Sequence, residues 1–121
     1  MDTDWAQVGL TVVVRASGRS VIVRPEGELD NDTAEPLYEA LNTVLRGPPG
    51  PVVVDCDGLS FCDSTGLNLL LRARRSAEGD GRTLLLAGLS PTVSRLFEIT
   101  GAGTMFRIYP SLADALAGQD G

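Results

Sequence analysis

Apolar residues along this chain form both alternating and continuous runs, and each pattern predicts a different kind of strand. "LTVVVRAS" (10–17) alternates apolar positions, and "SVIVRPEG" (20–27) follows a turn that contains Gly18. Together they predict an antiparallel hairpin. "PVVVDC" (51–56) and "TLLLAG" (83–88) are continuously apolar instead. Such runs are typical of central strands that are covered by helices on both faces.

Other segments carry apolar residues at the spacing of amphipathic helices. They are residues 33–46, the leucine-rich stretch that contains Leu67, Leu70 and Leu71, and residues 90–101 and 111–118. We expect Thr33 to be the N-cap of the first helix, because this choice puts Pro36 in the first turn, where no intrahelical donor is lost. Ser90 and Gly101 bracket the third helix, and Ser111 caps the fourth.

The predicted order of elements is ββαβαβαβα, with the last strand in "TMFRIYP" (104–110). Short links between alternating strands and helices imply mostly parallel pairing with right-handed crossovers. We therefore expect one α/β domain over residues 1–121, with helices packed on a mixed sheet of about five strands. The ordered core is expected at about residues 9–117, between short loose termini.

The charge balance excludes some classes of partner. The net charge is −6, whereas nucleic-acid binding rests largely on neutralising phosphates with Lys and Arg. No apolar run approaches the roughly 20 residues that a membrane-spanning helix needs, and "MDTDWAQ" lacks the basic start of a signal peptide. We expect a cytoplasmic protein that binds neither nucleic acid nor membrane.

The two cysteines give no sign of a metal or redox site. Cys56 and Cys62 lie too far apart for a C-x-x-C motif, and the chain has no His with which to build the usual Cys/His zinc sites. We expect reduced thiols and neither a metal nor a cofactor.

The stretch "LSFCDSTGLN" (59–68) places an acid and two hydroxyls where a buried strand turns into a helix. A nucleophilic Ser64 would need a base, and the sequence contains no His and no Lys, so hydrolase chemistry is disfavoured. Two interpretations remain. Asp63 or Ser64 caps the helix, or Ser64 accepts a phosphate whose charge repels a partner. Composition alone does not choose between them.

Three stretches occur along the chain in the order "GELD" (27–30), "LSFCDSTGL" (59–67) and "SPTVSRLFEITG" (90–101). With these motifs the sequence resembles the STAS family, and specifically its freestanding anti-sigma factor antagonists, also called anti-anti-sigma factors. The expected order of elements is also that of the family, so the resemblance spans the chain from the first strand to the last helix.

The resemblance implies a partner switch. In the family the serine of the D-S-[ST]-G motif, here Ser64, is phosphorylated by an anti-sigma factor that is also a serine kinase using ATP and magnesium. The unphosphorylated antagonist binds that kinase and frees the sigma factor. The phosphorylated form lets go, and a phosphatase resets it. The chain itself would then need no cofactor and perform no catalysis.

By the same resemblance, the partner-binding residues are Asp30, Asp63, Ser64, Thr65 and Gly66. Thr65 is a secondary candidate acceptor, and Gly66 would allow a close approach at the helix start. Cys62 and Thr65 depart from the methionine and serine that are common in the family, which bears on partner identity. The alternative is a constitutive STAS scaffold subunit of a stress-sensing or transport complex, in which Ser64→Asp would leave binding intact.

Overall fold

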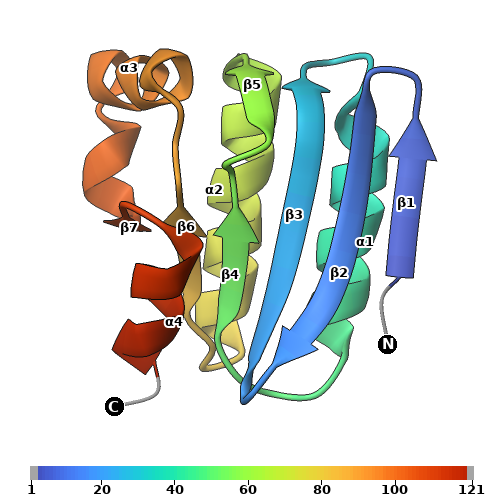
Figure 1. Cartoon of the computed structure of the whole chain (residues 1–121), viewed down its shortest axis with the longest axis vertical. Coiled ribbons are helices and arrows are strands. Elements are labelled where there is room, and N and C mark those ends of the chain that lie inside the picture. The colour runs from blue at the N-terminus through green and yellow to red at the C-terminus, as the bar shows by residue number, and fades with distance from the viewer. Residues whose placement is uncertain (1–2, 120–121) are drawn as a thin grey trace.

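One mixed sheet runs through the molecule and carries helices on both faces (Figure 1). The computed structural model describes residues 3–119. Its elements in chain order are β1 (Thr3–Gln7), β2 (Leu10–Ser17), β3 (Ser20–Leu29), α1 (Ala34–Arg46), β4 (Val52–Asp55), β5 (Leu59–Cys62), α2 (Ser64–Gly79), β6 (Leu84–Ala87), α3 (Pro91–Thr100), the 3-10 helix η1 (Ala102–Met105), β7 (Arg107–Tyr109) and α4 (Leu112–Gln119).

The strand order is β1-β2-β3-β4-β6-β7, and β5 also pairs with β3. The first three strands are antiparallel to one another, whereas β4, β5, β6 and β7 extend the sheet by parallel pairing. β3 has two successive neighbours on one edge, because residues 21–23 pair with β4 and residues 27–29 pair with β5. The switch from β4 to β5 brings the start of α2 to the carboxyl end of the sheet.

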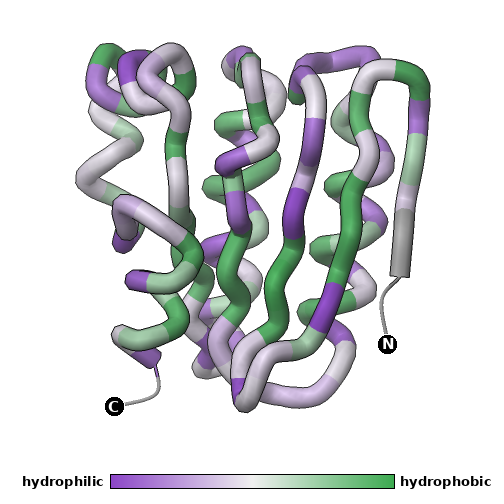
Figure 2. Tube along the Cα trace, in the orientation of Figure 1, coloured by the Kyte–Doolittle hydropathy of each residue, from purple (hydrophilic) through white to green (hydrophobic). Residues whose placement is uncertain are grey.

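The main core lies between the sheet and the helices α1 and α2, which Figure 1 shows behind the strands. A smaller cluster lies on the opposite face, where Ala115 of α4 packs with Val53, Leu85 and Ala87. β4 and β6 are buried at every position because helices cover both of their faces. Their apolar runs are visible as green stretches of the trace in Figure 2.

The expected α/β fold and mixed sheet are confirmed, but within residues 3–119 the sheet has seven strands where about five were expected. β1 and β5 were not predicted. β1 lies entirely in the region expected to be a loose N-terminus, before residue 9. It is ordered because residues 3–7 pair with the edge of β2 while Trp5 packs against the core. At the other end, α4 continues to Gln119. The remaining terminal residues, 1–2 and 120–121, lie outside the described residues.

Most of the predicted helix boundaries are also confirmed. The Ser90 hydroxyl accepts a hydrogen bond from the N–H of Val93 at 3.2 Å, and Gly101 ends α3 with a left-handed φ of 76°. Ser111 accepts from the N–H of Asp114. The last strand is shorter than expected, since Thr104 turns back in η1 by donating its N–H and hydroxyl to the Gly101 carbonyl.

A buried arginine closes the end of α1. Arg82 donates from Nη1 to the carbonyl of Val44 at 2.9 Å and from Nε to the carbonyl of Gly50 at 3.0 Å. A cation suits the C-terminus of a helix, where the carbonyls have no intrahelical partner. Arg82 therefore ties the end of α1 to the start of β4.

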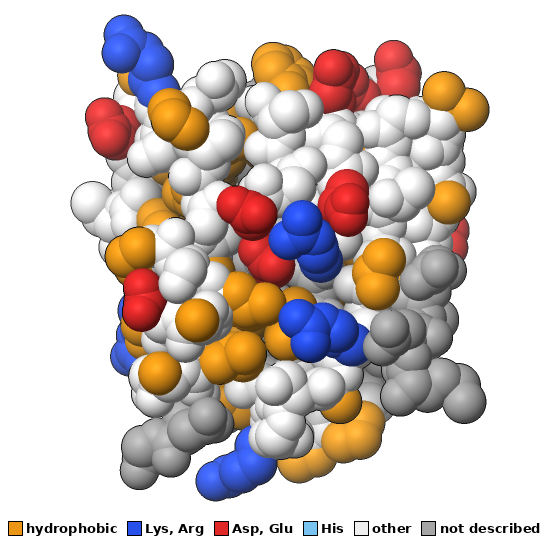
Figure 3. Space-filling model, in the orientation of Figure 1, with side chains coloured by type: hydrophobic (Ala, Val, Ile, Leu, Met, Phe, Trp, Pro, Cys, Tyr) orange, Lys and Arg blue, Asp and Glu red, His pale blue; other side chains and the backbone are white. Residues whose placement is uncertain are grey.

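A second charged group lies over the sheet face that carries α4. Asp55, only 3% exposed, accepts from Nη1 of Arg24 at 2.8 Å, and Glu26 lies 3.4 Å from Nε of the same arginine. The hydrogen bond to Asp55 raises the pKa of Arg24. Figure 3 shows basic and acidic side chains side by side on this face. The pairing compensates for the burial of the Asp55 carboxylate.

Candidate functional site

Ser64 is the first residue of α2, directly after the strand β5 and the N-cap Asp63. The Asp63 carboxylate accepts a hydrogen bond from the N–H of Gly66 at 3.1 Å, so the aspartate performs the capping. The Ser64 side chain is exposed, and its hydroxyl makes no hydrogen bond to any residue from 3 to 119. Asp63 therefore caps the helix, and the serine hydroxyl is left exposed.

Thr65 is less accessible than Ser64. Its side chain is half-buried and lines a hollow between α1 and α2. Asp32, Glu35 and Arg72 line the same hollow. Exposure therefore favours Ser64 over Thr65 as a candidate acceptor.

Gly66 is buried and lets α2 begin close to the strands. A Cβ at this position would lie 2.6 Å from Cγ of Leu29 and 2.9 Å from Sγ of Cys62. Both separations are shorter than real contacts allow, so a larger residue would push the helix start away from β3 and β5. The close approach agrees with the expected reason for glycine here. Because Gly66 is buried, it positions the start of α2, and the accessible surface is formed by Asp63, Ser64 and Thr65.

Asp30 follows the end of β3 and lies at the same edge of the sheet as Asp63. The two strand ends are joined by a hydrogen bond from the N–H of Asp63 to the carbonyl of Leu29 at 3.1 Å. The Asp30 carboxylate accepts from the N–H groups of Asp32 and Thr33, at 2.9 and 3.1 Å, and so orders the turn into α1. The structure thus brings Asp30 and Asp63 together from distant parts of the chain.

Thr33 corrects one expectation and adds a residue to the site. It stands at the N-cap position of α1, but its side chain makes no capping hydrogen bond. The hydroxyl donates instead to the carbonyl of Glu28 at 2.7 Å and accepts from the N–H of Asp30 at 2.9 Å. The buried Thr33 therefore holds the loop that carries Asp30.

Two exposed apolar side chains lie at this end of the molecule. Phe61 of β5 is 42% exposed and precedes Asp63 by two residues. Val8, in the turn between β1 and β2, is 95% exposed, and this turn is held to β3 by the hydrogen bond from the N–H of Glu28 to the carbonyl of Gly9. Single exposed apolar residues are common on protein surfaces, so these two add apolar area to this edge of the sheet without by themselves defining a binding patch.

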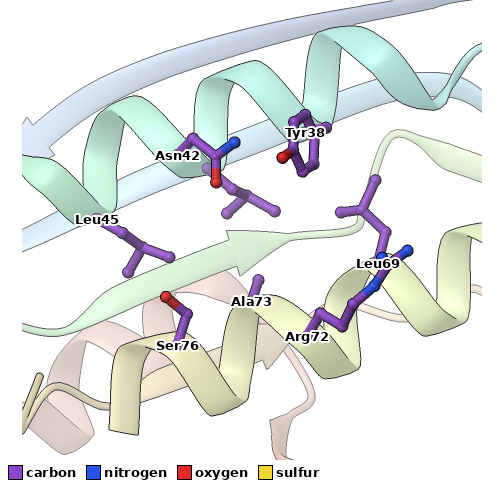
Figure 4. Close-up of a pocket in the computed structure, with 8 residues that line it drawn as sticks. Tyr38, Asn42, Leu45, Leu69, Arg72, Ala73 and Ser76 are labelled. Atoms are coloured by element: carbon purple, nitrogen blue, oxygen red, sulfur yellow. The ribbon is translucent and has the colours of Figure 1, made fainter. Parts of the chain in front are cut away.

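A groove between α1 and α2 runs on from this end. Its apolar part, about 180 Å³, is lined by Tyr38, Leu41, Asn42, Leu45, Leu69, Arg72, Ala73 and Ser76. Figure 4 shows that these side chains come from two facing helices. Its polar part, about 410 Å³, shares Tyr38, Leu69 and Arg72 with the apolar part and reaches Thr65. We call the two parts together the α1–α2 groove; sequence reasoning missed it because it depends on how two helices pack.

Both thiols are buried and free. Burial, together with the negative charge of Asp63, raises the pKa of Cys62 to about 12, and burial raises the pKa of Cys56 still further. Both groups are therefore neutral near pH 7 and poor nucleophiles. Within residues 3–119, no three acidic or thiol side chains are grouped so that they could hold a metal ion, and no helix is long and apolar enough to cross a membrane.

The sequence matches a known family over most of its length. The family described as "Mlab, STAS domain" matches residues 12–109. An anti-sigma F factor antagonist from Lysinibacillus sphaericus is 35% identical over 86 residues, which are 69% of this chain and 73% of the relative. An anti-sigma-B factor antagonist from Staphylococcus aureus is 31% identical over 86 residues, 71% of this chain and 80% of that protein.

Solved structures give the same result. An anti-sigma factor antagonist from Mycobacterium paratuberculosis superposes with a TM-score of 0.87 at 27% identity, covering 97% of this chain and 99% of the other. The antagonist SpoIIAA in its unphosphorylated form has a TM-score of 0.74 at 27% identity, over 87% and 92% of the two chains. The phosphorylated form of Bacillus SpoIIAA has a TM-score of 0.69 at 26% identity, over 88% and 96%.

Proposed function

The chain belongs to the STAS domain family, and on that premise we propose that it is an anti-sigma factor antagonist whose binding is switched by phosphorylation of Ser64. Two relatives above 30% identity carry the name of antagonists, and a similar solved protein is known in unphosphorylated and phosphorylated forms. The partner is an anti-sigma factor, and the unphosphorylated chain binds it so that a sigma factor is released.

The observation that carries the proposal is that Asp63 caps the helix, so that Ser64 need not. Asp63 caps α2, which leaves the neighbouring serine exposed at the first position of the helix. The hydroxyl is therefore available to a kinase without any unfolding of the helix start. The first-turn N–H groups and the positive end of the helix dipole favour an anion at this position.

Phosphorylation changes the surface much more than the fold. A phosphoserine adds about −1.5 to −2 charge at pH 7. It would stand beside Asp63 and close to the end of β3, where Asp30 follows. A partner that had packed against the neutral hydroxyl would then have to desolvate a dianion next to carboxylates, so the complex would dissociate.

The anti-sigma factor is also the kinase in this proposal. The Ser64 oxygen bonds to the γ-phosphorus of ATP as the bond to ADP breaks, and the hydroxyl proton is released. ATP and magnesium belong to the kinase, and the chain itself supplies the acceptor and performs no catalysis. A separate phosphatase hydrolyses the phosphoserine and restores binding.

The test is to incubate the purified protein with ATP, magnesium and purified anti-sigma factors of its source organism, one at a time. We expect one of them to add a single phosphate, located on Ser64 by peptide mapping. Thr65→Ala should still be phosphorylated, and Ser64→Ala should not. The same anti-sigma factor should bind the unphosphorylated protein and fail to bind the phosphorylated protein or Ser64→Asp.

Two results would contradict the proposal. Phosphate that remains in Ser64→Ala and disappears in Thr65→Ala would move the acceptor to Thr65. Binding that is unaffected by Ser64→Asp, without phosphorylation by any of the anti-sigma factors, would support the constitutive scaffold in place of the switch.

A further inference from the structure

The α1–α2 groove starts at the phosphorylation site and leads away from it. Thr65, the residue after Ser64, lines its polar part, and Ser76 lines its far end three turns along α2. A partner that contacts Ser64 thus meets the mouth of the groove without leaving the surface. Tyr38, 51% exposed, lines both parts and stands where they join.

The two parts of the groove differ in chemistry. The polar part presents the exposed carboxylates of Asp32 and Glu35 against one guanidinium, that of Arg72. The apolar part is lined chiefly by leucines of the two helices and by Ala73. A half-exposed tyrosine between acidic and apolar surfaces suits the stem and head of a basic side chain, whose methylenes pack on the ring while its charge faces the acids.

We propose that the α1–α2 groove receives a segment of the anti-sigma factor that carries a basic side chain followed by an apolar one. The basic group lies between Asp32 and Glu35, and the apolar group enters between Tyr38 and Leu69. This inference rests on the proposed function and extends its binding surface beyond the loop around Ser64. The excess of acidic residues in the groove and in the whole chain, whose net charge is −6, favours a basic partner.

The groove would decide which anti-sigma factor binds. The Ser64 hydroxyl and the helix cap Asp63 offer the same chemistry to any serine kinase. They therefore make binding depend on phosphorylation, but they do little to distinguish one anti-sigma factor from another. Exposed side chains of α1 and α2 do not build the core, so they can vary without loss of the fold. The groove presents several of them, Glu35, Tyr38 and Arg72 included, beside its buried leucines. Selectivity thus resides in the groove and switching resides in Ser64.

The experiment uses the full-length protein and the anti-sigma factor that phosphorylates Ser64 in the assay above. Glu35→Arg reverses a charge inside the groove, and its matched control is Glu39→Arg, an exposed glutamate of the same helix that does not line the groove. Tyr38→Ala removes the central ring, and Ile108→Ala, an exposed apolar residue of β7, is its control. Circular dichroism and thermal unfolding establish that each variant is folded.

We expect Glu35→Arg and Tyr38→Ala each to weaken binding by about tenfold or more, and the controls to change it by less than about threefold. Glu35→Arg should also reduce the dependence of the association rate on salt. If the wild type binds and both groove variants bind as tightly as their controls, the groove does not receive the partner. This result would leave the proposed switch at Ser64 unaffected. If the wild-type protein binds no anti-sigma factor, the proposed function is wrong, and so is the proposal that an anti-sigma factor segment occupies the groove.

Discussion

The N–H of Asp63 donates to the carbonyl of Leu29 at 3.1 Å, and this bond joins two parts of the chain that are 34 residues apart. It places the end of β3 beside the start of α2, so that Asp30 and Ser64 belong to one surface. The loop of Asp30 is held in turn by Thr33, and the start of α2 is held by Asp63 and by the packing of Gly66. None of these contacts uses the Ser64 hydroxyl, so a change at that hydroxyl leaves them in place.

Two replacements of Asp63 separate its capping hydrogen bond from its negative charge. Asp63→Ala removes the acceptor for the Gly66 N–H, and we expect it to lower the free energy of unfolding by about 1 kcal/mol in urea titrations. Asp63→Asn keeps a capping oxygen and should stay within about 0.5 kcal/mol of the wild type. Equal losses in the two variants would show that the charge, rather than the cap, stabilises the protein.

Gly66→Ala should be destabilising because its new methyl group meets Leu29 and Cys62 in the core. Overpacking of this kind costs about 1–3 kcal/mol of unfolding free energy. Gly79→Ala is the matched control, since it lies in the same helix and a Cβ there meets nothing within 4 Å. This control should be neutral or stabilising by up to about 1 kcal/mol, and an equal loss at both glycines would contradict the packing argument.

The buried Arg82 should contribute measurably to the free energy of unfolding through its hydrogen bonds to two carbonyls. Arg82→Met keeps much of the side-chain volume but removes the donors to Val44 and Gly50, and we expect a loss of about 1.5–3 kcal/mol in unfolding free energy. Arg75→Met, at an exposed position of α2, should change it by less than about 0.5 kcal/mol. A comparable stability in both variants would show that the carbonyls find other donors.

The buried thiols predict how stability depends on pH. The folded protein raises the pKa of Cys62 from an ordinary 9.0 to about 12, so above pH 9 the unfolded chain loses its proton first. Stability is therefore complete below about pH 9 and falls as the pH rises toward 12. Unfolding titrations at pH 8 and pH 10 should show a smaller pH-dependent loss in Cys62→Ala than in the wild type. An equal loss in the two proteins would assign the alkaline sensitivity to other groups.

Much of the fold follows from local patterns in the sequence. The continuous runs of β4 and β6 and the caps of α3 are set by residues close together in the chain, so their roles could be predicted. β1 and β5 could not. β1 contains only one large apolar residue, Trp5, and its order depends on pairing with the edge of β2. β5 is four residues long and exposes Ser60 and Phe61.

The site divides in the same way. Asp63 and Ser64 are adjacent, so the candidate cap and acceptor were visible in the motif, although the sequence did not say which residue would cap. The Thr33 hydroxyl donates to the Glu28 carbonyl instead of capping α1, and this could not be predicted because it depends on the conformation of the loop after β3. The groove depends on the packing of α1 against α2, which no local pattern encodes.

The long strand β3 links the central strands of the sheet to the strand that leads to Ser64. One uninterrupted strand pairs with core strand β4 along its first half and with β5, which leads to Ser64, along its second. We therefore expect the two halves of β3 to unfold together, so that their backbone amides exchange with solvent through one cooperative opening. In the proposed switch, the signal is therefore held by the covalent state of the Ser64 side chain and needs no second conformation of the domain.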